Sequence, residues 1–390
     1  MEFKILFIVL FFVFEYYKAE LSEDGKLNFL QLAQKYGHSA IEYHVITEDG
    51  YILKLFRIPG AVGIPVLLMH GILDSSDTWL IRGNGSLCIT LARQGYDVWI
   101  ANNRGNRYGR NHLYLDPNSN DGFWDFSFHE IGYFDLPAII DTVLLISNAS
   151  KVNAIGHSQG NTVFYVLGST RPEYNAKVNV IIALAPVAFL NNIPHPLKDI
   201  IDISSALVDV AQILNIHEVL GDKSISRATL RKFCSKKFVG YKVCVLGFLF
   251  PLSGYDEDEL EKNYTPTFFG HFPAGTSLKS LQHYAQVSLR RKFAAFDYGE
   301  ENYAVYQSPV PPEYDLSAVT MKIVLFVGAN DKISTVEDVA ILRQKLPNDT
   351  QYLLLPRRKM NHVDFISGRH MGDYLFSYIF DVLTENGGKE

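Results

Sequence analysis

The chain has 390 residues, of which 47% are hydrophobic and 20% charged, and its formal net charge at pH 7 is −6. This length exceeds that of a typical single core, so one large domain with a substantial insertion is expected. The acidic balance, together with the absence of any long basic run, excludes nucleic acid from the expected partners.

The N-terminus has the pattern of a secretory signal peptide. Lys4 precedes the apolar run 5–14, and Ala19 is a candidate cleavage position. Ten apolar residues are too few to span a hydrocarbon core of about 30 Å, and no later stretch approaches that length. We therefore predict that residues 1–19 are removed, that the mature chain has no transmembrane anchor, and that the protein is secreted. A lysosomal destination begins with the same signal peptide and stays open.

In a secreted protein, cysteines can form disulfides and Asn-x-Ser/Thr sequons can carry glycans. Cys234 and Cys244 are close enough in sequence to form a disulfide, which leaves Cys88 unpaired. The alternative is three free, buried thiols. Four Asn-x-Ser/Thr sequons are predicted to carry glycans, at Asn84, Asn148, Asn263 and Asn348.

Short apolar runs alternate with helical patterns in the first half of the chain. The segments 43–45 and 51–56 flank an Asp-Gly turn and predict a β-hairpin. The further predicted strands are 65–69, 97–101, 152–155 and 178–185, and the predicted helices are 87–94, 136–147 and 162–169. Strands that are apolar throughout and separated by helices indicate an α/β fold with a mainly parallel sheet and helices on both faces.

This alternation stops after Pro186. From there to about residue 312 the chain is predicted to be mostly helix and loop, including the segments 200–214 and 245–252. Strand patterns resume at 322–327 and 351–355, with helices predicted at 336–346 and 373–384. The sequence therefore predicts an α/β core in two pieces, residues 20–186 and 313–390, and an insertion, residues 187–312, which we call the cap.

Residues Gly156–Gly160 match the pattern G-x-S-x-G around Ser158. The pattern alone is a weak signal, but a short strand leads into it and a helix follows, which is the setting of a nucleophile in the α/β-hydrolase fold. There the serine occupies a strained turn, and small residues on either side avoid collisions with the neighbouring strand and helix. The alternative is a glycine-rich turn with a solvated serine.

The α/β-hydrolase order is Ser, then acid, then His, with each partner in a loop after a later strand. Asp331 follows the predicted strand 322–327, and His362 follows the predicted strand 351–355. We therefore predict that Ser158 is the nucleophile, His362 its base and Asp331 the group that orients the imidazole.

Other ionisable residues lie near these two in sequence. Asp364, Asp315 and His370 are rivals for the acid and the base. Asp364 is only two residues past His362, which indicates local loop structure rather than catalysis. A histidine in a loop is more often solvated and has no catalytic role. The assignment of His362 as the base therefore depends on the serine motif and on the position of Asp331.

An acyl-transfer site also needs two backbone N–H groups that bind the developing oxyanion. The amide of Gln159, next to the nucleophile, is one candidate. The other is the amide of Ile72, in the loop after the strand 65–69. The alternative for the His70-Gly71 pair is a tight turn without a catalytic role.

With these residues the chain closely resembles the acid lipase family, which comprises gastric and lysosomal acid lipases and their insect relatives. The resemblance extends from about residue 30 to the C-terminus. The segments that carry it, besides the serine motif, are His70–Leu73, Gly95–Trp99, Asn103–Asn106, Phe123–Ser127, Tyr133–Asp141, Ala183–Ala188, Pro273–Ser277 and Asn361–Phe365.

The resemblance implies an α/β-hydrolase core with a helical cap, and hydrolysis of triacylglycerols or sterol esters without a metal or a cofactor. It implies Ser158, Asp331 and His362 as triad, Gln159 and Ile72 as oxyanion donors, and a cap disulfide between Cys234 and Cys244. Two features depart from the family. Ile72 replaces a usual leucine, which leaves the backbone donor intact, and the segment 357–360 is unusually basic.

A lipid substrate is the most specific of these expectations. The apolar run 245–250 offers walls for long acyl chains, whose burial contributes about 0.8 kcal/mol per methylene, and a movable part of the cap would expose apolar surface at a lipid–water interface. The alternative is that this run is the cap's own core. Two other functions stay open, an α/β-hydrolase acting on non-lipid esters or thioesters and a non-catalytic lipid-binding protein.

Overall fold

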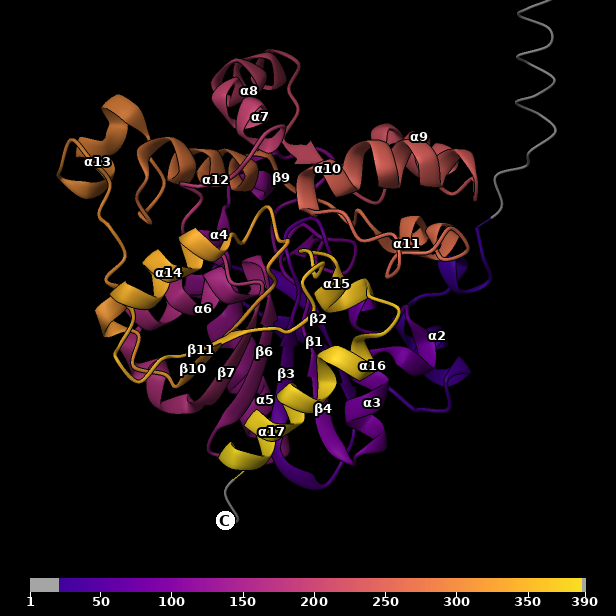
Figure 1. Cartoon of the computed structure of the whole chain (residues 1–390). Coiled ribbons are helices and arrows are strands. Elements are labelled where there is room, and N and C mark those ends of the chain that lie inside the picture. The colour runs from indigo at the N-terminus through magenta and orange to yellow at the C-terminus, as the bar shows by residue number, and fades with distance from the viewer. Residues whose placement is uncertain (1–20, 388–390) are drawn as a thin grey trace, which may run out of the picture.

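A mainly parallel β-sheet forms the centre of the molecule (Figure 1). The structure is a computed structural model that describes residues 21–387, so the predicted signal peptide, residues 1–19, lies outside the described residues. The strand order is β1-β2-β4-β3-β6-β7-β10-β11, and β5 pairs with β2. The pairs β1–β2, β2–β4 and β2–β5 are antiparallel, and all other neighbours are parallel. The predicted fold class is confirmed.

Every strand of the central sheet except β5, which the sequence pattern does not predict, matches a predicted apolar run to within a few residues. The strands are β1 (Ile41–Ile46), β2 (Tyr51–Ile58), β3 (Val62–Met69), β4 (Tyr96–Ile100), β5 (Asn111–His112), β6 (Val152–His157), β7 (Val178–Leu184), β10 (Ile323–Val327) and β11 (Gln351–Leu354). The predicted hairpin is β1–β2, and Gly50 in its turn has φ +97°, a conformation that glycine adopts without a steric penalty.

The central strands are mostly apolar because both of their faces are covered. In β3 the side chains of Val66 and Leu68 pack into one core cluster, whereas Leu67 and Met69 pack into the other. All four are fully buried, and complete burial of such a side chain contributes roughly 1.5–3 kcal/mol. The helices α3 (Leu87–Arg93) and α17 (Phe376–Asn386) contribute to the first cluster, and α5 (Leu136–Ser147), α6 (Gln159–Thr170) and α14 (Val336–Lys345) contribute to the second.

Two predicted helices are interrupted. The segment 200–214 forms α7 (Leu197–Asp202) and α8 (Ser204–Ile213), and the break is at Ile203. The C-terminal segment forms α16 (Met371–Tyr374) and α17, with a break at Leu375. Apolar periodicity continues through both breaks, so the sequence pattern alone does not reveal them. The remaining helices of the core are α2 (Phe29–Lys35), α4 (Phe128–Glu130) and α15 (Asp364–Ser367).

Between β7 and β10 the chain adds no strand to the central sheet. Figure 1 shows the helices of this part together across one end of the sheet. They are α7, α8, α9 (Ile225–Cys234), α10 (Phe250–Ser253), α11 (Thr265–His271), α12 (Leu278–Arg290) and α13 (Asn302–Tyr306), with the π-helical segment Tyr241–Leu249 before α10. Two short strands, β8 (Glu218–Val219) and β9 (Thr276–Ser277), pair antiparallel and were not expected, because two residues carry no periodicity. The cap boundaries at 187 and 312 stay a prediction.

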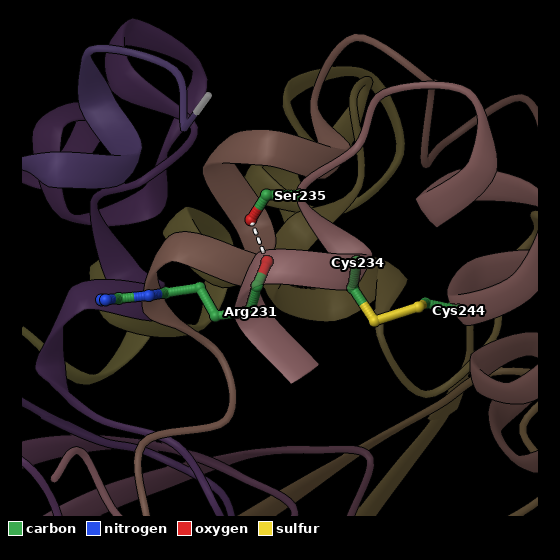
Figure 2. The surroundings of a disulfide bond; sticks show 4 residues. All are labelled: Arg231, Cys234, Ser235 and Cys244. Atoms are coloured by element: carbon green, nitrogen blue, oxygen red, sulfur yellow. Dashed lines mark hydrogen bonds between the residues drawn. A yellow bond between two sulfur atoms is a disulfide. The ribbon is translucent and has the colours of Figure 1, made fainter. Parts of the chain in front are cut away.

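The structure contains the disulfide between Cys234 and Cys244 (Figure 2), with a Cα–Cα distance of 5.7 Å. It connects the end of α9 to the π-helical segment. At the same helix end the hydroxyl of Ser235 donates a hydrogen bond to the carbonyl oxygen of Arg231 at 2.6 Å, which satisfies a carbonyl of the last turn. Cys88 is a free, buried thiol.

Candidate active site

Ser158 is the single residue between the end of β6 and the start of α6. Its backbone has φ 53° and ψ −117°, a strained conformation for a residue with a side chain. The turn is held by the amide of Ser158, which donates to the carbonyl of Leu184 at 3.1 Å, and by its carbonyl, which accepts from the amide of Asn161 at 2.9 Å. Strain persists at a site only when the surroundings over-determine it, and this turn meets that condition.

Close neighbouring atoms leave no room for a side chain at Gly156 or Gly160, on either side of the serine turn. A β-carbon at Gly156 would lie 2.3 Å from the amide oxygen of Asn161, and one at Gly160 would lie 2.2 Å from the carbonyl oxygen of Met69. Both distances are far inside van der Waals contact, so neither position accepts a side chain. This agrees with the reason given above for small residues around the serine.

The structure brings the three predicted side chains together. His362 Nε2 lies 2.9 Å from Ser158 Oγ, and His362 Nδ1 lies 2.9 and 3.1 Å from the two carboxylate oxygens of Asp331. An ionised carboxylate only accepts hydrogen bonds, so Nδ1 carries the ring proton and Nε2 accepts from the serine hydroxyl. The exposed fractions are 5% for Ser158, 6% for Asp331 and 7% for His362. The three groups form one buried hydrogen-bonded chain.

Backbone groups orient the carboxylate of Asp331. Its Oδ1 also accepts from the amides of Ile333 and Ser334, both at 2.8 Å. The hydroxyl of Ser334 donates to the carbonyl of Pro186 at 2.7 Å, which ties the loop after β10 to the segment after β7. The carboxylate therefore faces the imidazole from a fixed loop.

The rival residues have other partners. Asp364 accepts from the amide of Asn361 at 2.9 Å, and burial raises the pKa of its carboxyl well above its usual value. Asp315 is exposed and caps a short 3-10 helix by accepting from the amide of Ser317 at 3.0 Å. His370 Nδ1 lies 3.0 Å from a carboxylate oxygen of Glu259. None of these hydrogen bonds involves Ser158, His362 or Asp331.

Two backbone amides lie near Ser158. Gln159 is the first residue of α6, and Ile72 lies in the loop after β3. A β-carbon at Gly71 would lie 3.3 Å from Ser158 Cβ, so this loop passes directly against the serine. Within residues 21–387, neither the Gln159 nor the Ile72 amide donates to another group of the protein. Unused N–H groups at a helix start and a neighbouring loop are the donors that an oxyanion requires.

Two contacts of the His362 backbone have no signature in the sequence. His157 Nε2 lies 2.9 Å from the carbonyl oxygen of His362. Burial, followed by the proximity of His362, lowers the pKa of His157 well below its usual value, so the neutral ring donates to that carbonyl. From the cap, the carbonyl of Ser253 accepts from the amides of His362 at 3.2 Å and Lys332 at 3.4 Å. One cap carbonyl thus contacts both the acid loop and the base loop.

The predicted glycosylation positions are accessible. All four sequon asparagines have exposed side chains: Asn84, Asn148, Asn263 and Asn348. Their modification stays a prediction. Across residues 21–387, no helix combines the length and the apolar composition that crossing a membrane requires.

Comparison with known proteins places this site in a family. A model of a partial alpha/beta-hydrolase lipase region matches residues 29–83, and a model of the alpha/beta hydrolase fold matches residues 64–204. Lipase 1 of Drosophila melanogaster is 36% identical over 94% of this chain and 82% of its own length. Gastric triacylglycerol lipase of Rattus norvegicus is 34% identical over 93% of both chains, and human lipase member K is 32% identical over 93% of this chain and 92% of its own.

Solved structures agree on the fold alone. An esterase from Thermogutta terrifontis aligns with a TM-score of 0.51 at 13% identity, over 89% of this chain and 100% of its own. An esterase from Exiguobacterium antarcticum also has a TM-score of 0.51, at 12% identity and the same coverage. With near full-length relatives above 30% identity, the chain belongs to the acid lipase family of α/β-hydrolases.

Proposed function

We propose that this protein hydrolyses carboxylic esters of neutral lipids, triacylglycerols or sterol esters, through an acyl-enzyme at Ser158. The observation that carries the proposal is the buried chain from Ser158 Oγ through His362 to Asp331, with both links at 2.9 Å, in a member of the acid lipase family. A serine hydroxyl is a weak nucleophile without such a base.

The geometry supports a two-step cycle. The hydroxyl of Ser158 attacks the ester carbonyl carbon while His362 Nε2 takes its proton, and Asp331 stabilises the imidazolium that forms. The tetrahedral oxyanion accepts hydrogen bonds from the Gln159 and Ile72 amides, each of which contributes about 3–4 kcal/mol. The oxyanion then collapses and the alcohol leaves with the proton from His362. Water, activated by the same imidazole, releases the fatty acid.

Side chains and amides of the chain handle every proton and charge of this cycle. The proposed mechanism therefore requires neither a metal ion nor a cofactor. Gly156 and Gly160 keep the serine turn compact, and the contacts of His157 and Ser253 hold the base in place.

An apolar stripe on the cap supports a substrate at a lipid–water interface. On α7, on α8 and at the residue that follows each of them, six large apolar side chains are at least 40% exposed, and all but the last are three or four residues from the one before: Ile200, Ile203, Leu207, Val210, Ile213 and Leu214. Within α8 this spacing places the apolar side chains on one face of the helix. Figure 1 shows α7 and α8 on the side of the cap away from the sheet. An exposed apolar face of this kind marks an interaction surface, and the partner that we propose is the surface of a lipid aggregate.

We also propose that the protein is secreted. The apolar run 5–14, the disulfide and the four exposed sequons support an oxidising, glycosylating route. Lysosomal delivery uses the same route. Phosphorylated mannose on the purified glycans would place the protein there instead.

Covalent labelling tests the nucleophile. An organophosphonate ester should label the wild-type protein with one group per chain, and Ser158→Ala should not be labelled. Ser205→Ala, which removes an exposed serine of α8, is the matched control and should label fully. Undiminished labelling of Ser158→Ala would remove the assignment.

A panel of esters tests the substrate class. Rates with long-chain triacylglycerols and sterol esters should exceed those with short, dissolved esters once each is compared at saturation. A strong preference for the short esters would remove the lipid assignment and leave the hydrolase.

A further inference from the structure

The loop after β3, residues 70–76, is hydrogen-bonded to the segment 102–106, which follows β4. The amide of Ser76 donates to the side-chain oxygen of Asn102 at 2.9 Å. The side-chain amide of Asn106 lies 3.2 Å from the carbonyl oxygen of Asp74. The segment 103–106 is one of the family motifs found in the sequence, and the cycle described above makes no direct use of it.

A buried arginine fixes this supporting segment. Arg104 Nε donates to Asp135 at 2.8 Å, and the other guanidinium nitrogens reach Asp135 and Asp49. Arg104 and Asp135 are both buried. Because ion pairs at such depth hold only with well-formed geometry, the segment has little freedom to move relative to the sheet.

His70 connects the two segments, and its partners determine its tautomer. Its Nε2 lies 3.2 Å from the backbone nitrogen of Asn103 and 3.0 Å from the side-chain nitrogen of Asn106. A backbone N–H only donates, so Nε2 is the acceptor and the ring proton is on Nδ1. Nδ1 lies 2.8 Å from the carbonyl oxygen of Gly71 and donates to it. Burial lowers the pKa of His70 to about 4, which keeps the ring in this neutral form at neutral pH.

The carbonyl of Gly71 and the N–H of Ile72 belong to the same planar trans peptide and point in opposite directions. A hydrogen bond that fixes the carbonyl on one side therefore also fixes the direction of the N–H on the other. We infer that His70 is a positioning residue, which aims the Ile72 amide at the oxyanion by holding the Gly71 carbonyl. The inference rests on the proposed function, because it concerns the same reaction.

Two substitutions separate the two hydrogen bonds of His70, the one that Nδ1 donates to the Gly71 carbonyl and the one that Nε2 accepts from Asn103. His70→Asn places a side-chain N–H where Nδ1 is and keeps a donor for the Gly71 carbonyl. His70→Gln places an amide oxygen where Nε2 is and keeps an acceptor for Asn103, but removes the donor to Gly71. A merely structural role of His70 predicts no advantage for His70→Asn.

The experiment measures kcat and KM with a dissolved short-chain ester, together with inhibition by a boronic acid that forms a tetrahedral adduct on the serine. His70→Gln should lower kcat roughly 10- to 100-fold with little change in KM, since an oxyanion donor acts in the transition state. Boronate affinity should fall in parallel. His70→Asn should recover most of both quantities, and His44→Gln, at an exposed histidine, should leave both unchanged.

Two results would overturn the inference. One is equal kcat for His70→Asn and His70→Gln, and the other is a change confined to KM. Thermal unfolding of His70→Asn and His70→Gln checks that both variants keep the fold. Organophosphonate labelling of the wild type at Ser158 is measured in the same series, so a failure of the proposed nucleophile is told apart from a failure of His70.

Discussion

The serine turn and the outer cap helices differ in how tightly their residues are packed and in how much of them is exposed. Around Ser158 a single added β-carbon at Gly156 or Gly160 would collide with neighbouring atoms, and Ser158, Asp331 and His362 are each at most 7% exposed. On α8, by contrast, Leu207 is 51% and Ile213 83% exposed. Under the proposed function, chemistry that needs fixed atoms takes place where packing is complete, and contact with a lipid surface uses apolar side chains that the fold itself does not cover.

The two regions are joined at one short segment of the cap. The carbonyl of Ser253 accepts from Lys332 and His362, and the carbonyl of Gly254 accepts from the side chain of Asn361 at 3.0 Å. Asn330 donates to the carbonyl of Tyr255 at 2.9 Å. The segment 253–255 thus contacts the loops of both Asp331 and His362, and a displacement of the cap there would reach the triad.

The largest expected effect is within the packed region. Asp331→Asn keeps the shape of the side chain but offers an N–H toward His362 Nδ1 or stabilises the wrong tautomer, so kcat should fall about 10⁴-fold. Thermal unfolding should change little. Asp315→Asn, at an exposed residue, is the control. A loss of less than tenfold would show that another group orients the imidazole.

The second prediction concerns the contact between the cap segment 253–255 and the loops of Asp331 and His362. Gly254 has φ +112°, and a β-carbon there would lie 2.1 Å from the carbonyl oxygen of Asn330. Gly254→Ala should therefore push the cap away from the Asp331 loop and lower kcat roughly 10- to 100-fold on every ester, long or short.

Gly247→Ala is the matched control for that variant. A β-carbon at Gly247 would meet only the carbonyl of Lys242, at 3.4 Å, so activity should be kept. If both glycine variants behave alike, the junction does not position the triad.

The disulfide gives the third prediction. It closes a loop with a sequence separation of 10 residues, so replacing Cys234 and Cys244 with alanine should lower the free energy of unfolding by about 2–3 kcal/mol in the chain-entropy model. Denaturant unfolding measures this change. Cys88→Ala, at the free buried thiol, corrects for lost side-chain volume. Equal losses in the two proteins would mean that the cross-link itself contributes nothing.

The same contrast explains what the sequence could predict. The strands, the serine turn and the positions of Asp331 and His362 have local signatures, apolar runs followed by short loops in a fixed chain order. The contacts of His157 and Ser253 with the base loop have none, because a carbonyl acceptor leaves no mark in the sequence.

The apolar run 245–250 shows where hydrophobicity alone was ambiguous. Val245 and Phe250 are buried in the first core cluster, to which α3 and α17 also contribute, whereas Phe248 is 61% exposed. The buried residues agree with a role in the core, and the walls for an acyl chain stay a prediction. A continuous apolar run predicts burial of some surface, but the face that is buried depends on packing partners from distant parts of the chain.

The smallest expected effect is on the outer cap helices. Full burial of a leucine or isoleucine contributes roughly 1.5–3 kcal/mol, and partial immersion in a lipid surface contributes less. Leu207→Ser with Ile213→Ser should therefore lower the rate on emulsified long-chain triacylglycerol by about tenfold, which corresponds to about 1.4 kcal/mol. The rate on a dissolved short ester should not change, because the packed site is untouched. Gln212→Ser, on the same helix, is the polar control and should change neither rate. An equal loss on both substrates would assign the stripe a structural role, and no loss on either would mean that another surface meets the lipid.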